Sequence, residues 1–120
     1  LRLPGCFRPD KNSGTVVGVF LYDADDEGIQ TDFAFFGVAP AQPTDNSAFA
    51  PTDVELRSCL GVISVSSFYN WSVNQLGQNI VDRLWMKAPS TDLWVAAIAR
   101  GAPNIAAGSL PRVAFAVIPD

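Results

Sequence analysis

The sequence predicts an all-β fold, a small antiparallel β-sandwich or barrel with at most one short helix. Runs of β-branched and aromatic residues recur along the chain, and segments rich in Gly, Pro, Asp and Asn separate them. Segments with helical periodicity do not alternate with these runs, which argues against a parallel βαβ architecture. The 120 residues are enough for one hydrophobic core and too few for two, so we expect a single β domain over residues 1–120. We also expect this domain to be a segment excised from a larger parent polypeptide.

The first two predicted strands flank an acidic segment. Residues 15–22 form a run of Val, Phe, Leu and Tyr, and residues 29–38 alternate Phe with smaller or polar residues. Residues 23–28 between them are mostly carboxylates and end in Gly28. We predict that the two strands pair as a hairpin.

A long loop and a third strand follow. Residues 39–53 hold three prolines and several turn-forming residues, which predicts a loop of unusual length and therefore a place for partner contacts. Residues 54–65 alternate as a third strand, with an irregularity near Arg57, and this strand continues or turns into residues 68–73.

The second half of the chain contains one ambiguous segment. In residues 76–87, Leu76, Ile80 and Leu84 have helical spacing and predict a short helix. Gly77 disfavours that helix by roughly 1 kcal/mol relative to Ala, and the last residues of the segment alternate as in a strand. Residues 92–99 and 112–118 are the last two predicted strands, joined by a loop over residues 100–111.

Composition excludes several functional classes. The chain has no histidine, which argues against Ser-His-Asp and Cys-His triads and against most zinc sites, so we expect no enzymatic activity. The net charge is −4 without a basic cluster, so we expect no nucleic-acid partner. No apolar run reaches the roughly 18 residues of a membrane span, so we expect no membrane insertion.

The acidic segment is a candidate calcium site. Asp23, Asp25 and Glu27 stand at alternate positions, and Gly28 permits a tight turn. Calcium prefers such oxygen ligands, but position twelve of an EF-hand loop would be Ala34, so an EF-hand is rejected. Two hypotheses remain: a calcium ion bound by Asp23, Asp25 and Glu27, or a solvated acidic turn that protects an edge strand from aggregation.

Aromatic residues and cysteines supply the remaining candidates. Tyr69, Trp71 and Trp85 are candidates for a binding surface, because flat amphipathic rings are enriched in interfaces and sugar-binding platforms; core packing is the alternative. Cys6 and Cys59 either form one disulfide or remain buried thiols.

The chain resembles the protruding surface domain of a small icosahedral RNA-virus capsid protein, of nodavirus or related type. Its strand-rich body, its Pro- and Ala-rich loops, the motif at residues 23–25 and the ending at residues 110–118 carry the resemblance. The resemblance implies a β fold, dimeric or trimeric spikes on the virion surface and attachment to a host receptor or glycan. It also implies calcium held by Asp23 and Asp25 between subunits.

A different class of protein fits the same residues. A secreted carbohydrate-binding or adhesin-like β module would use Tyr69, Trp71 or Trp85 as stacking rings and would be extracellular. A structural domain without a ligand is a third alternative.

Overall fold

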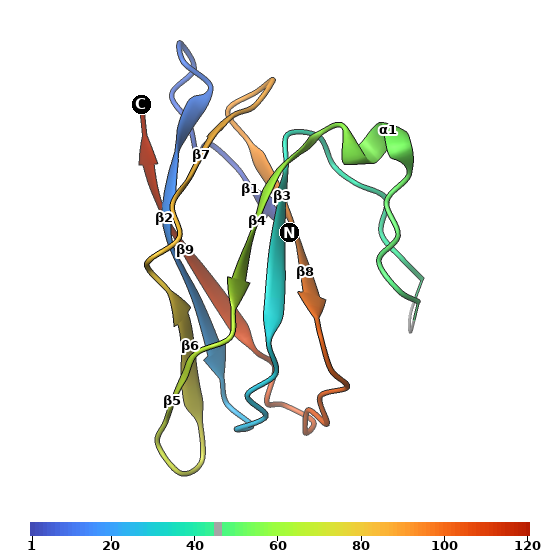
Figure 1. Cartoon of the computed structure of the whole chain (residues 1–120), viewed down its shortest axis with the longest axis vertical. Coiled ribbons are helices and arrows are strands. Elements are labelled where there is room, and N and C mark those ends of the chain that lie inside the picture. Colours follow the sequence, from blue (N-terminus) through green and yellow to red (C-terminus); the bar gives the residue numbers. More distant parts are fainter. Residues whose placement is uncertain (45–46) are drawn as a thin grey trace.

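A computed structural model describes residues 1–44 and 47–120 of the chain. Within these residues, nine strands form two antiparallel sheets that pack face to face, and one short helix lies at the end of a long loop (Figure 1). The elements are β1 (Arg2–Leu3), β2 (Ser13–Asp23), β3 (Thr31–Phe36), α1 (Asp53–Leu56), β4 (Cys59–Val65), β5 (Phe68–Asn70), β6 (Gln75–Asn79), β7 (Leu84–Lys87), β8 (Leu93–Ala99) and β9 (Arg112–Pro119). The predicted all-β sandwich is therefore confirmed.

The two sheets differ in their central strands. The four-stranded sheet has the order β1-β8-β3-β4, so β3 and β8 are its inner strands. In the five-stranded sheet, β2 is central: β9 pairs along one side, while β7 and then β6 pair along successive parts of the other side. β5 extends this sheet by pairing with β6.

Alternate residues of the two sheets form the core between them. Val16 and Val19 of β2 and Phe33 and Phe35 of β3 are fully buried between the packed sheets. Phe33 and Phe35 follow the period-two alternation of a strand, whereas the three-residue spacing of Val16 and Val19 spans an irregularity in β2 between Val16 and Gly18. Phe115 of β9 meets Phe33 edge to face, with 5.6 Å between the ring centroids. The predicted strands 92–99 and 112–118 are confirmed as β8 and β9.

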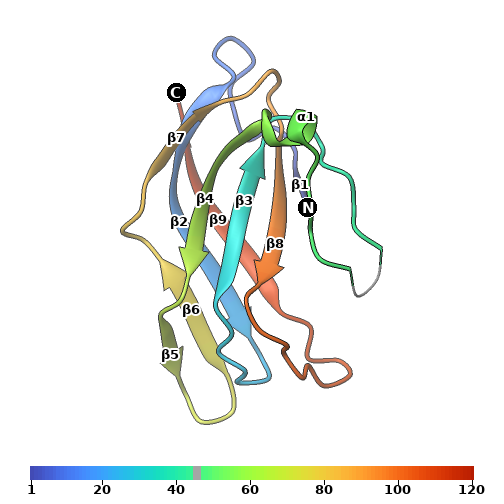
Figure 2. The same cartoon turned by 45° about the vertical axis from the view of Figure 1, so that its right-hand side comes forward.

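The predicted hairpin of residues 15–22 with 29–38 is wrong. β2 and β3 belong to different sheets, and the acidic segment carries the chain across from one sheet to the other (Figures 1 and 2). Both sides of β2 are occupied by β6, β7 and β9, so no backbone edge remains for β3.

The predicted helix over residues 76–87 is also wrong. The segment contains two strands, β6 and β7, with a break at residues 80–83. Leu76, Ile80 and Leu84 have helical spacing, but β6 and β7 form long-range backbone pairs with β2 instead. In this arrangement a side chain at position 77 would collide with Phe68.

The third strand begins later than the sequence predicts. Residues 53–56 form α1, and β4 starts at Cys59. Thr52 and Glu55 form a capping box, in which the Thr52 side chain accepts from the Glu55 backbone N–H and the Glu55 carboxylate accepts from the Thr52 backbone N–H. These hydrogen bonds stabilise a helical turn where the alternating pattern of residues predicts a strand.

The predicted loop 39–53 projects beside the four-stranded sheet (Figure 2). Its residues 45–46 lie outside the described part of the chain. Phe49 from this loop packs edge to face on Phe36, with 5.9 Å between the ring centroids. Across residues 1–44 and 47–120, no helix has the length and apolar character needed to cross a bilayer.

Candidate functional site

The outer face of the five-stranded sheet carries a row of exposed and half-exposed side chains. Tyr69 lies opposite Leu76, Leu76 opposite Tyr22, and Tyr22 opposite Arg112, so one side chain from each of four neighbouring strands stands in this row. Leu21, which precedes Tyr22, and Gly77, which follows Leu76, face the core instead. The row therefore presents two tyrosine rings, a leucine and an arginine on the face away from the core.

Tyr69 and Trp71 form a stacked pair at one end of this row. Their ring centroids are 6.5 Å apart, and the ring planes differ by 24°. Each side chain is 59% exposed, so the pair is not part of the core. A ring that keeps this much surface in water offers a flat apolar face to a ligand.

A tight turn after β5 places Trp71 beside Tyr69. The Trp71 backbone N–H donates to the Asn74 carbonyl, and the Ser72 backbone N–H donates to the Asn70 side-chain oxygen. Ser72 has a φ of 77°, in the left-handed region that non-glycine residues adopt rarely. The positive φ and the two hydrogen bonds turn the chain back, so that Trp71 stacks on the preceding strand.

A shallow hollow of about 320 Å³ adjoins the pair. Its wall combines the Trp71 ring with apolar and polar side chains from β2, β6 and the turns between strands. The lining residues are Tyr22, Asp23, Ala24, Trp71, Asn74, Gln75 and Leu76. An aromatic face beside amide and carboxylate groups can bind a ligand that has both apolar and hydroxyl-bearing surfaces.

The acidic turn is held to its neighbours by its own carboxylates. Asp23 accepts hydrogen bonds from the backbone N–H groups of Asp25 and Gly28, at 3.1 and 2.9 Å. Asp25 accepts from the Ala106 backbone N–H, and Asp26 accepts from the Asn70 side-chain amide at 2.7 Å. The turn thus anchors both the loop before β9 and the turn that carries Trp71.

These hydrogen bonds bear on the proposed calcium ligands. The structure places Asp23, Asp25 and Glu27 in one turn, but the first two carboxylates already accept backbone hydrogen bonds. Among the described residues, no group of three or more His, Cys, Asp or Glu side chains is close enough to hold a metal ion. Glu27, together with Asp23, lies instead at a cavity between the two sheets.

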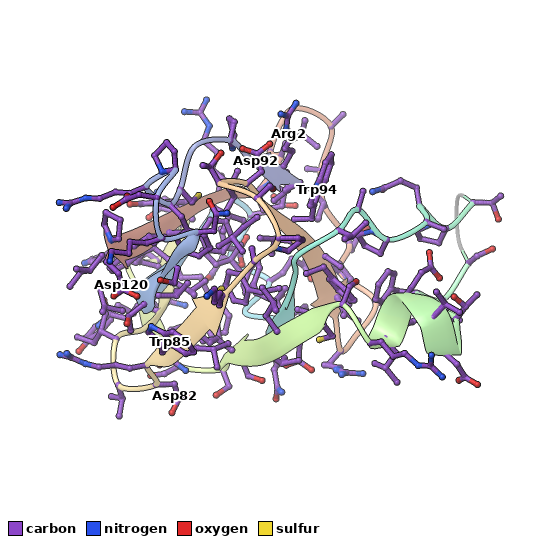
Figure 3. The ribbon with its side chains drawn as sticks, turned by 90° about the horizontal axis from the view of Figure 1, so that it is seen from above. Arg2, Asp82, Trp85, Asp92, Trp94 and Asp120 are labelled. Atoms are coloured by element: carbon purple, nitrogen blue, oxygen red, sulfur yellow. The ribbon has the colours of Figure 1, made fainter. Side chains whose placement is uncertain are left out.

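Trp85 lies at the far end of the same sheet face. Its indole N–H donates to the Asp120 carboxylate at 2.9 Å, and Figure 3 shows these two side chains together, well apart from Trp94. Trp85 is opposite Thr15, whereas the Tyr69 row crosses β2 at Tyr22, seven residues further along. At about 3.3 Å per residue the separation is roughly 20 Å, so Trp85 does not share the hollow beside Trp71.

The possible disulfide between Cys6 and Cys59 is not formed; both are free thiols. Cys6 follows β1 and donates to the Leu3 carbonyl, while Cys59 begins β4. β1 and β4 are the opposite edges of the four-stranded sheet, roughly 14 Å apart at the usual strand spacing. A disulfide requires Cα atoms within roughly 7 Å.

No protein-family model, curated protein or solved structure matches the chain.

Sequence patterns identified part of this site and missed the rest. They identified Tyr69 and Trp71 but not Tyr22, Asn74 and Gln75, which complete the hollow. Tyr22 ends an otherwise apolar run, and its outward direction follows once Leu21 is placed inward. Asn74 and Gln75 carried no such signal, because the sequence did not show that β6 pairs with β2.

Proposed function

We propose that this chain is a protruding surface domain of a viral capsid protein that takes part in spike oligomerisation and host-cell attachment on the virion. We further propose that its attachment ligand is a glycan bound by Tyr69 and Trp71. The observation that carries the proposal is the stacked, exposed aromatic pair beside the hollow at Tyr22 and Asn74. The proposed activity is binding, with no catalytic step.

The chemistry of the hollow suits a sugar ring. The Trp71 face can cover the apolar C–H side of a pyranose, since burying such a face against a large ring is favourable at little entropic cost. Each Asp23 carboxylate oxygen has lone pairs beyond those used by the turn, and the Asn74 amide supplies donors and an acceptor. Together these groups bind one apolar face and several hydroxyls.

The topology is compatible with a capsid domain. The chain passes repeatedly between two antiparallel sheets, which is the pattern of jelly-roll sandwiches, and these occur in viral capsid and lectin domains. Because one fold serves many functions, the topology supports the proposal only together with the aromatic site and the sequence resemblance.

The second candidate function is a secreted carbohydrate-binding module, and the same aromatic pair favours it. The two candidates differ in what the parent polypeptide does. Assembly of the parent polypeptide into particles that display this domain would support the capsid function. Glycan binding by a parent that never assembles would support the secreted module.

The direct test of the ligand is a glycan array probed with the chain, followed by calorimetry on any glycan that binds. Trp71→Ala should weaken binding by at least about 30-fold, the effect of losing a central aromatic contact worth about 2 kcal/mol. Trp85→Ala is the matched control, because Trp85 is also 59% exposed but lies outside the hollow. Equal losses in both variants, or no binding to any glycan, would refute the glycan proposal.

A further inference from the structure

β9 leaves one edge of the five-stranded sheet open. Its residues pair with β2 on one side, and no strand in the described part of the chain pairs with the other side. The Asp120 backbone N–H donates to the Ser13 carbonyl, toward β2. Because backbone direction alternates along a strand, the N–H groups of Val113, Phe115 and Val117 point away from β2, toward the open edge.

The inward side chains of β9 are covered on one side only. Val113, Phe115 and Val117 pack against the core but remain half-buried. The inward residues Val16 and Val19 of the adjacent β2 are fully buried. The difference follows from position, because β2 has a neighbour on both sides and β9 has one.

This edge lacks most of the usual protection against strand addition. From Val113 to Ile118 the strand is apolar, without a charged residue. Pro119 removes the N–H that would face outward at the end of the strand, so it shields that position alone. A long apolar edge strand of this kind is normally paired or covered.

Among the described strands, β9 is the outermost on its side of the five-stranded sheet. It has the central strand β2 as its neighbour on one side, and no described strand pairs with its other side. In the four-stranded sheet, by comparison, β8 has a paired strand on both sides, β1 and β3.

We propose that the open edge of β9 binds an extended polypeptide strand from outside these 120 residues, antiparallel to β9. Its inward side chains would be apolar and would complete the burial of Val113, Phe115 and Val117. Its polar side chains would alternate with them on the solvent face. The proposal does not depend on glycan binding.

The charged residues at the two ends of β9 indicate which charges the ends of the partner strand should carry. Arg112, at the start of β9, is exposed and makes no ion pair with a described residue. Asp120, just after the end of β9, carries a carboxylate that accepts from Ser13 and Trp85. An antiparallel partner with a basic residue at its start and an acidic residue at its end would complement both charges.

A cavity at the Arg112 end gives the partner a further contact. It has a volume of about 170 Å³ and lies between the sheets, with a mostly apolar wall that includes Leu21, Phe33, Ala97 and Val113. An inward apolar side chain near the end of the added strand would lie against Val113, at the wall of this cavity. The partner is therefore expected to carry a large apolar residue next to its terminal acid.

The test supplies such a strand on the chain itself. A flexible Gly/Ser linker after Asp120 would carry the strand Lys-Val-Thr-Val-Thr-Val-Thr-Leu-Glu, because tethering raises its effective concentration to the millimolar range. We expect hydrogen exchange at the Phe115 and Val117 amides to slow at least tenfold, and the urea midpoint of unfolding to rise. The matched control replaces two of the valines by proline, which cannot pair with an edge.

A second control exchanges the terminal Lys and Glu of the added strand and should lose part of the protection at low salt. Exchange rates equal to those of the proline control would overturn the proposal. So would concentration-dependent protection of the same two amides in the unextended chain, measured alongside sedimentation equilibrium. That result would make a second copy of this chain the occupant of the edge.

Discussion

Asp32 is a buried carboxylate whose hydrogen-bond partners come from three different segments. It is 6% exposed and lies on β3, on the face opposite the core residue Phe33. It accepts from the Ser64 hydroxyl at 2.6 Å, from the Arg100 guanidinium and from the Gln30 amide. These contacts tie β3 to β4 and to the end of β8, and they compensate for the loss of water around the charge.

Replacing Asp32 with Asn should destabilise the protein at neutral pH. The neutral amide cannot accept from Arg100 and Ser64 as the carboxylate does, and hydrogen bonds to charged groups contribute roughly 1.5–3 kcal/mol each. Because Arg100 is more than half exposed, we expect a total loss of about 1–3 kcal/mol, measured by urea unfolding. Asp92→Asn breaks an ion pair with Arg2 that lies in a more exposed place and should cost less. An equal or larger loss in Asp92→Asn would contradict the assignment of Asp32 as the structural carboxylate.

The same residue gives stability a defined pH dependence. The Ser64 hydroxyl, followed by Arg100 and Gln30, holds the pKa of Asp32 below its ordinary value of 3.8 against the opposing effect of burial. A carboxyl group whose pKa is lowered by folding stabilises the protein above the unfolded-state pKa, and that contribution is lost as the pH falls through the folded-state pKa. The difference in unfolding free energy between wild type and Asp32→Asn should therefore be full at pH 7 and shrink below about pH 4. A difference that stays constant from pH 7 to pH 3 would exclude this mechanism.

At the scale of the element, Gly77 shows why β6 lies where it does. A Cβ atom at this position would come within 2.6 Å of the Phe68 ring and 2.7 Å of a Val65 methyl group. The close approach of β6 to these side chains requires a residue without a side chain. In the sequence Gly77 suggested only a weak helix, because the contact that needs it joins residues from other strands.

Gly77→Ala should destabilise the sandwich by roughly 1–3 kcal/mol, the usual cost of inserting an extra methyl group into a packed core. Combining it with Val65→Ala, which removes one of the colliding methyl groups, should cost less than the sum of the two single losses. Thermal or urea unfolding of the two single variants and the double variant measures this coupling. Strict additivity would mean that the new methyl group does not press on Val65.

Elements that are defined by their own residues could be predicted from the sequence, whereas elements that depend on pairing with a distant strand could not. β2, β8 and β9 are continuous apolar runs, and their residues alone define them. α1 had a local signal as well, the Thr52 and Glu55 capping box, but strand alternation from Val54 onward concealed it. β6 and β7 are strands only because β2 offers them an edge, and a single sequence does not show that pairing.

At the scale of the whole molecule, the crossing of the chain between sheets decides which distant residues meet. The acidic turn sends β3 to the opposite sheet, and β6 pairs with the end of β2. This pairing brings Tyr22 and Asp23 beside the turn that carries Trp71. The aromatic half of the candidate site was predictable from composition. Its polar half depends on sheet order, which is set by the packing of the complete chain.

The same sheet order separates the two cysteines, and this is open to a direct test. Cys6 follows one edge strand of the four-stranded sheet and Cys59 begins the other, so freshly folded protein should contain two free thiols. Alkylation in denaturant without reductant, followed by mass spectrometry, should label both. In the native state Cys6 should react more slowly than in the denatured state, because burial raises the pKa of its thiol and so lowers the thiolate fraction.

The double variant Cys6→Ser with Cys59→Ser should not show the loss of roughly 4 kcal/mol that removal of a bridge closing a loop of about 50 residues would cause. A protein that resists alkylation until it is reduced would place the two cysteines together and contradict the sheet order from which their separation follows.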